Sequence, residues 1–246
     1  MKSLITWGKT RTYDINMISP FIPIRYTTYI EPFAGSASLF FSLNNFSINS
    51  VLNDINDDLM NFYQQIKDGK GEEIKEFMDN HENNKETYYN ILHNYCPNNP
   101  VEQASQFYYL RKTCHRSMLR YNKLGLFNVA FGNNEHINYD ALTDRTYKDA
   151  LENTRIMNGD FAAVFEEYNG ADNFIFIDPP DENESINSFT QDDHLRLFRY
   201  FTETDSKCLG IFRDTPFIKE LYIDYIIAAY PLKNKMGTEF IVSNLA

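Results

Sequence analysis

The segment spanning residues 27–54 places two short apolar runs around a loop of small residues, an order that few folds accommodate. Thr27–Glu31 (TTYIE) is β-rich, Pro32–Ser36 (PFAGS) follows it, and the apolar spacing of the next residues (SASLFFSL) suits a helix packed on a sheet. Ser50–Asp54 (SVLND) then predicts a second strand that ends in an acid. Strand, small-residue loop, helix, strand and acid are typical of the first half of a doubly wound nucleotide-binding unit.

A mostly helical stretch separates this unit from a second set of strands. We expect helices near residues 57–68, 71–80, 85–95 and 101–120, followed by a loop-rich piece, YNKLGLFNVAFGNN. Strand patterns return in Asn173–Ile177 (NFIFI), a continuous apolar run typical of a central parallel strand. The remaining expected elements are a helix in DDHLRLFRYF (192–201), strands near 207–212, 224–229 and 239–243, and a helix near 216–222.

These elements predict an α/β fold with a mostly parallel central sheet interrupted by an insertion. Residues 1–56 and 150–246 are expected to form one discontinuous domain, and residues 57–149 a mainly helical inserted subdomain. The chain has 246 residues, of which 43% are hydrophobic, enough for one sizeable core.

The overall charge argues against a nucleic-acid partner, but its distribution does not. The chain carries 23 Lys and Arg against 34 Asp and Glu, a net charge of -11, the reverse of a generic nucleic-acid binder. Yet Ala104–Asn134 contains no acid and alternates its basic residues with Tyr, Phe and Asn, a composition typical of phosphate contact and base-edge readout. Within the helix expected there, Arg116 and Arg120 are four residues apart and would share one face; a solvated helix face is the alternative.

Cysteine and hydropathy patterns predict a soluble, cytoplasmic protein, compatible with expression in a phage- or virus-infected cell. The three cysteines form no CxxC pair and the five histidines show no metal-ligand spacing, so we expect reduced thiols and no metal. No apolar signal region opens the chain, and Leu221–Leu232 is broken by Asp224, so no membrane partner is expected. The oligomeric state stays open.

Two loops carry residues suited to chemistry. Small residues from Ala34 to Ala37 let a ligand approach the backbone at a helix N-terminus, and Asp54 is placed to bind ribose hydroxyls, although a strand-end Asp also serves as a cap or turn residue. Asp178-Pro179-Pro180 follows the apolar strand and leaves a carboxylate and bare carbonyl oxygens at its end, because proline cannot donate a hydrogen bond. Acceptors without donors suit an exocyclic amino group.

Gly8-Lys9-Thr10 resembles the end of a phosphate-binding P-loop. However, Ser3 stands where that pattern requires glycine, and no strand precedes it, so ATP hydrolysis is disfavoured.

The order of these motifs resembles the Dam-type DNA adenine-N6 methyltransferases, Rossmann-like enzymes that use S-adenosylmethionine and carry D-P-P-Y at this strand end. YIEPFAGSASLF resembles their cofactor loop, LNDIN their ribose-binding stretch, and Asn158–Phe161 (NGDF) the element beside the cofactor adenine. In the insertion, KTCHR, RYN and FNVAFG resemble the target-recognition segment, with Ala130 in place of its proline. The resemblance covers nearly the whole chain.

The resemblance implies direct methyl transfer from the sulfonium of S-adenosylmethionine to N6 of an adenine flipped out of double-stranded DNA. Its implied catalytic residues are Asp178, Pro179, Pro180 and Asp181. Its implied cofactor-binding residues are Trp7, Lys9, Arg11, Glu31, Pro32, Phe33, Ala34, Gly35, Ser36, Asp54, Ile55, Asp160, Phe161 and Asp178. Its implied DNA-binding residues are Arg111, Lys112, Arg116, Arg120, Asn122, Lys123 and Asn128. Arg11 takes the family's lysine position in an ungapped alignment, a deletion puts Lys9 there, and a basic N-terminal loop is the alternative.

The departure from the family is Asp181, which replaces the aromatic that stacks on the flipped base. Such stacking is worth about 1 to 3 kcal/mol, a loss of about 5- to 150-fold in rate if nothing replaces it. Residues 178–193 hold six acids and no Lys or Arg, which would repel DNA phosphate. Phe189 could supply the stack, or could simply pack the following helix. A weakened or inactive relative that binds cofactor or nucleic acid, or acts as an interaction subunit, and an RNA adenine methyltransferase remain alternatives.

Overall fold

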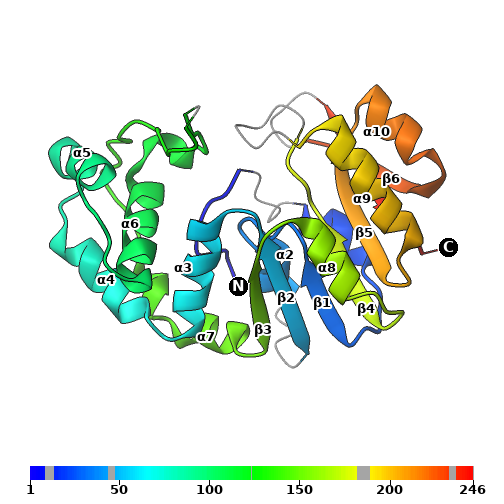
Figure 1. The fold of residues 1–246 in the computed structure, drawn as a ribbon, viewed down its shortest axis with the longest axis horizontal. Helices are drawn as coiled ribbons and strands as arrows, with labels where there is room; N and C mark the ends of the chain where they lie inside the picture. Colours follow the sequence, from blue (N-terminus) through cyan, green and yellow to red (C-terminus); the bar gives the residue numbers. More distant parts are fainter. Residues whose placement is uncertain (9–13, 44–47, 123, 182–188, 233–236, 246) are drawn as a thin grey trace.

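A central sheet of seven strands dominates the part of the chain that the computed structural model describes, residues 1–8, 14–43, 48–122, 124–181, 189–232 and 237–245 (Figure 1). The strands are β1 (Thr28–Glu31), β2 (Asn49–Asp54), β3 (Thr154–Asn158), β4 (Asn173–Ile177), β5 (Lys207–Arg213), β6 (Ile226–Pro231) and β7 (Thr238–Ser243). Their order in the sheet is β3-β2-β1-β4-β5-β7-β6. The first five strands in this order are parallel to one another, and β7 runs antiparallel to both of its neighbours, β5 and β6. The predicted α/β class with a mostly parallel sheet is confirmed.

Alternating side chains bury both faces of the sheet, which explains the continuous apolar run in β4. Tyr29 and Phe174 face one side, whereas Ile30 and Ile175 face the other. The second side is covered by α8 (Phe161–Glu167), α9 (Gln191–Glu203) and α10 (Pro216–Leu221), of which α8 and α9 cross the front of the sheet in Figure 1. The first side is covered by α2 (Ser38–Leu43), α3 (Asp57–Lys67) and α7 (Arg145–Leu151).

Three of the four helices α3 to α6 have an asparagine at the N-cap position. Helix α3 is followed by α4 (Gly71–Asn80), α5 (Lys85–His93) and α6 (Pro100–Thr113). Asn56, Asn84 and Asn99 cap α3, α5 and α6, each accepting from a backbone N–H three residues on. The short elements are α1 (Ile15–Ile18), η2 (Ser19–Phe21), η3 (His115–Ser117), η4 (Asp140–Thr143) and η5 (Ile223–Tyr225).

Two predicted elements have wrong bounds. Helix α6 ends at Thr113 instead of continuing to 120, because Cys114 is extended and bridges to Phe131, and Arg116 and Ser117 take positive φ values of 52° and 51°. Arg116 and Arg120 therefore do not share a helix face. The strand expected at 224–229 begins at Ile226 because Ile223–Tyr225 forms a 3₁₀ turn. Strand β3 and helices α7 and α8 were not predicted.

The insertion shares its core with the sheet. Helix α3 packs against β2, β3, α6 and α7, and Leu52 of β2, Phe62 of α3 and Tyr108 of α6 belong to one buried cluster. Phe62 stacks on Tyr108 with ring centroids 5.1 Å apart. The predicted boundary at residue 57 thus passes through a continuous core.

Strand order also fixes where a ligand can bind. From β1 the chain continues to β2 on one side, whereas β4 continues to β5 on the other. The carboxyl ends of β1 and β4 therefore lie at a topological switch point, where the connections diverge and open a crevice.

Replacing Phe62 with alanine tests the shared core. The side chain is fully buried in the cluster that α3 forms with α6 and the sheet. Phe62→Ala should therefore lower the free energy of unfolding by about 3 to 5 kcal/mol. Urea denaturation followed by far-ultraviolet circular dichroism should show one transition that shifts as a whole. Two separate transitions, with only one displaced, would contradict a continuous core.

Candidate active site

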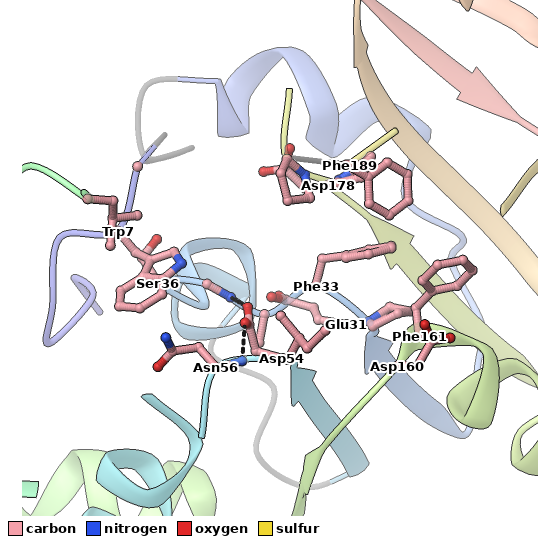
Figure 2. Close-up of a pocket in the computed structure, with 18 of the residues that line it drawn as sticks. Trp7, Glu31, Phe33, Ser36, Asp54, Asn56, Asp160, Phe161, Asp178 and Phe189 are labelled. Atoms are coloured by element: carbon pink, nitrogen blue, oxygen red, sulfur yellow. Dashed lines mark hydrogen bonds between the residues drawn. The ribbon is translucent and has the colours of Figure 1, made fainter. Parts of the chain in front are cut away.

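A pocket of about 790 Å³ opens at the carboxyl ends of β1, β2 and β4 (Figure 2). It gathers the predicted cofactor and catalytic residues of the described chain, except Asp181. Those lining it are Trp7, Glu31, Pro32, Phe33, Ala34, Gly35, Ser36, Asp54, Ile55, Asp160, Phe161, Asp178, Pro179 and Pro180. Lys9 and Arg11 lie outside the described residues.

The loop after β1 is held by two hydrogen bonds at Gly35. Its N–H donates to Asp54 Oδ2 at 3.0 Å, and the Tyr63 hydroxyl donates to its carbonyl at 2.9 Å. Gly35 has a φ of +48°, and a Cβ there would lie 3.0 Å from Trp7 Cδ1. Glycine is thus required both by the left-handed backbone and by the indole that packs on it.

Asp54 acts as a turn residue as well as a pocket residue. Its second oxygen accepts from Asn56 N–H at 3.0 Å, so each carboxylate oxygen receives one backbone hydrogen bond (Figure 2). Burial raises the pKa of Asp54, while these bonds oppose the rise. Beside it, the Asn53 amide donates to Pro32 O at 2.9 Å and Gly159 O at 3.0 Å, which joins the loops after β1 and β3.

Glu31 is a buried carboxyl at the end of β1. It is 2% exposed, and Oε1 accepts from the Tyr29 hydroxyl at 2.6 Å and from Phe40 N–H at 3.0 Å. Burial raises the pKa of Glu31 to about 8, against the lowering effect of these bonds, and the charge of nearby Asp178 adds to the rise. Without a cation in the pocket, Glu31 is therefore largely protonated at neutral pH.

This proton should make stability depend on pH. Between pH 4.5, the ordinary pKa, and about 8, Glu31 is ionised when unfolded but protonated when folded. Its stabilising contribution is therefore complete below pH 4.5 and is lost as pH rises through 8, by up to about 1.4 kcal/mol per pH unit. Glu31→Gln keeps an acceptor oxygen and should remove this slope. Urea denaturation across this range measures both proteins, and parallel pH profiles would contradict the assignment.

The opposite end of the pocket from Trp7 is aromatic, as Figure 2 shows. The Phe33 ring centroid lies 5.2 Å from that of Phe161 and 5.4 Å from that of Phe189. Asp160 caps α8 by accepting from Ala162 N–H at 2.9 Å.

Arg196 of α9 contacts the residues at this end of the pocket. Its guanidinium pairs with Asp160 at 2.9 Å and Asp193 at 3.1 Å, and lies 4.9 Å from the centre of the Phe161 ring. Two pocket carboxylates thereby share one cation, which offsets half of their combined charge.

Phe189 lines the pocket but is mostly enclosed by other side chains. It is 8% exposed and packs between Phe33, Phe161 and His194, the last at 4.7 Å in an edge-on arrangement. Since His194 belongs to α9, the interpretation that Phe189 packs the following helix is the one the structure shows.

Asp181 is turned toward a cation on the neighbouring strand. Its Oδ2 lies 3.8 Å from Nε of Arg213, the last residue of β5, and its side chain is 16% exposed. The charge that replaces the motif's aromatic is thus balanced within the protein. The acids Glu182 and Glu184, on which the expected repulsion of DNA also depends, lie outside the described residues.

Among the predicted DNA-binding residues that the structure describes, some are exposed and others make hydrogen bonds within the protein. Arg116 and Arg120 are exposed, although Arg120 donates to the Asn128 side chain at 3.0 Å and to its carbonyl at 2.6 Å. Asn122 Oδ1 accepts from the N–H groups of residues 124 and 126, so this side chain shapes a turn. Lys112 Nζ lies 3.3 Å from the Asn138 carbonyl. Lys123 lies outside the described residues.

Arg111 contradicts its predicted role. It is 2% exposed, and its guanidinium donates to the carbonyls of Thr6, Ser117 and Met118. A side chain enclosed in this way does not reach a DNA phosphate. The acid-free stretch Ala104–Asn134 predicts a DNA-binding surface, but Arg111, one of its cations, is buried and has a structural role.

The pocket extends to the insertion, where it includes Tyr121 of the RYN motif. Met118, Leu119, Tyr121 and Gly125 line it, and the Asn56 amide donates to the Tyr121 hydroxyl at 3.1 Å. Asn56 ends the LNDIN stretch and stands at a capping position before two acids, but nothing in the sequence indicated its contact with Tyr121, 65 residues away.

A doubly wound sheet with this pocket at its switch point is typical of the Rossmann-like class of α/β proteins that bind nucleotide-containing ligands, and comparison with known proteins gives the family. The family model of the D12 class N6 adenine-specific DNA methyltransferases matches residues 12–236. The chain belongs to this family and is an adenine-specific DNA methyltransferase.

Three relatives are similar over most of their length. The type II methyltransferase M.CviBI of Paramecium bursaria Chlorella virus NC1A is 40% identical, over 95% of this chain and 91% of its own. M.MjaIII of Methanocaldococcus jannaschii is 30% identical, over 84% and 81%. M1.LlaDCHI of Lactococcus lactis subsp. cremoris is 30% identical, over 99% and 95%.

Two general properties complete the description. None of the helices in the described residues has the length and apolar character needed to cross a bilayer. Among the same residues, no group of three or more His, Cys, Asp or Glu side chains is arranged to hold a metal ion.

Proposed function

We propose that the chain uses S-adenosylmethionine to methylate N6 of an adenine that is rotated out of double-stranded DNA. The observation that carries this proposal is the single pocket that contains both the loop after β1 and the Asp178-Pro179-Pro180 corner after β4. A methyl donor and an acceptor amino group bound there would share one enclosed space, which is what direct transfer requires.

The pocket residues suit this cofactor. Gly35 and Asp54 both line the pocket, and Asp54 faces it at a strand end as acids do toward ribose hydroxyls. Phe161 and Ile55 would hold the adenine, and Glu31 and Trp7 the methionine end. When bound, the cofactor supplies a methyl group activated by its sulfonium.

Asp178 and its prolines would prepare the amino group of the target adenine. The carboxylate and the Pro179 carbonyl accept hydrogen bonds, and neither Pro179 nor Pro180 has an N–H that could compete as a donor. Two acceptors on the N6 hydrogens concentrate the nitrogen lone pair, which is otherwise shared with the ring, for attack on the methyl group.

The insertion would read the DNA. Arg116 and Arg120 are exposed beside pocket residues Met118 and Tyr121, so phosphate contact and adenine capture would occur on the same segment. Residues 57–149 accordingly form the proposed recognition subdomain, and residues 1–56 and 150–246 the catalytic part. The names of the type II relatives support action at a defined DNA sequence.

Replacing Asp178 with alanine tests the chemical step. The purified protein is incubated with labelled S-adenosylmethionine and unmethylated duplex DNA, with an RNA of the same sequence in parallel. Asp178→Ala should lower kcat by at least about 100-fold because the amino group loses its charged acceptor, while cofactor affinity changes only a few-fold. Label found in cytosine, transfer to RNA alone, or wild-type kcat in the variant would each contradict the proposal.

Replacing Asp181 with tyrosine tests the altered motif position. A ring there could stack on the flipped adenine, so Asp181→Tyr should raise kcat/KM for DNA by about 5- to 150-fold. Asp181→Asn is the matched control, since it removes the charge beside Arg213 without adding a ring. An equal gain in the asparagine variant would show that charge, and not stacking, limits the wild type.

A further inference from the structure

Arg111 is a buried cation that binds two segments of different function. One nitrogen, Nη2, donates to Thr6 O at 2.8 Å and to Ser117 O at 2.7 Å, and Nη1 donates to Met118 O. Thr6 precedes the indole that packs on the loop after β1, whereas Ser117 and Met118 belong to the turn that follows α6. Within the described chain, no acidic side chain forms an ion pair with this guanidinium, so backbone carbonyls and rings balance its charge.

The two rings that face Arg111 come from the same two segments. Its guanidinium carbon lies 5.3 Å from the centre of the Trp7 ring and 5.7 Å from that of Phe127. Trp7 contacts Gly35, whose N–H is bound to Asp54. Phe127 bridges to Tyr121, which lines the pocket. One side chain thus connects the expected cofactor loop with the loop expected to meet DNA.

The turn that Arg111 holds is conformationally demanding. Arg116 and Ser117 are both left-handed, a backbone region that residues with a Cβ disfavour, and the carbonyls of Ser117 and Met118 point to Arg111. The exposed Arg116 side chain is on this turn. Contacts that DNA makes with the turn would therefore bear directly on the carbonyls that orient the guanidinium.

We propose that Arg111 is a positioning residue that couples DNA binding at the insertion to cofactor binding at the loop after β1. Since its hydrogen bonds and ring contacts order both segments, a ligand that orders one lowers the cost of ordering the other. This inference rests on the proposed function, because it requires that S-adenosyl ligands and DNA bind on either side of the guanidinium.

The coupling is measured with S-adenosylhomocysteine, which binds as the cofactor does but has no methyl group to transfer. Its Kd is determined by titration calorimetry with and without a short duplex taken from a DNA that the wild type methylates. The wild type should bind it at least about 5-fold tighter in the presence of the duplex. Arg111→Met, which fills the same buried space without charge, should reduce this ratio to near one, with each ligand alone still bound.

Arg155→Met is the matched control, because it makes the same substitution at an exposed arginine on β3 that pairs with Glu167, and should keep the wild-type ratio. If Arg111→Met fails to fold, Phe127→Leu removes one of the two rings and should lower the ratio in part. Wild-type coupling in whichever variant folds, or a ratio of one in the wild type, would overturn the inference. A wild type that transfers no methyl group would instead overturn the proposed function.

Discussion

The parallel pairing of β1 with β4 is the constraint on which the rest of the site depends. Because the chain leaves β1 toward β2 and leaves β4 toward β5, no crossover covers the edge where these two strands end. That pairing places Glu31, at the end of β1, close to Asp178, which follows β4. It also places the loop around Gly35 in the same pocket, next to Asp54. Strand order alone thus brings segments almost 150 residues apart to one opening.

The negative charges of several acids around this opening are each reduced or balanced by a specific partner. Glu31 holds a proton, Asp54 receives two backbone N–H groups, Asp160 and Asp193 share Arg196, and Asp181 faces Arg213. A chain with a net charge of -11 can therefore present a DNA-facing site that is far less negative than its composition indicates. The protonated Glu31 also provides a carboxyl that can ionise when a cationic ligand arrives, so the pocket adjusts its charge to its occupant.

Sequence reasoning was most accurate where chemistry is local. The loop after β1, the acid that ends β2 and the Asp178-Pro179-Pro180 corner could all be placed because each follows a strand directly, and strand direction determines the edge at which they meet. The errors came from contacts distant in sequence. The end of α6 depends on a bridge from Cys114 to Phe131, and the burial of Arg111 depends on Thr6, 105 residues away. Phe189 could not be separated from a base-stacking residue until its neighbours Phe33 and Phe161 were known.

The continuous core between the insertion and the sheet limits how this enzyme can diversify. Helix α3 contributes Leu59 and Phe62 to the same cluster as Leu52 of the sheet, so the insertion is not a detachable module. Exchange of the whole insertion with a relative would have to preserve that interface residue by residue. The loop from Cys114 to Phe131 is different, since it is tied back at the Cys114–Phe131 bridge and by Arg111. Under the function proposed above, substitutions at its exposed positions such as Arg116 and Arg120 would alter contact with DNA while leaving the shared core in place.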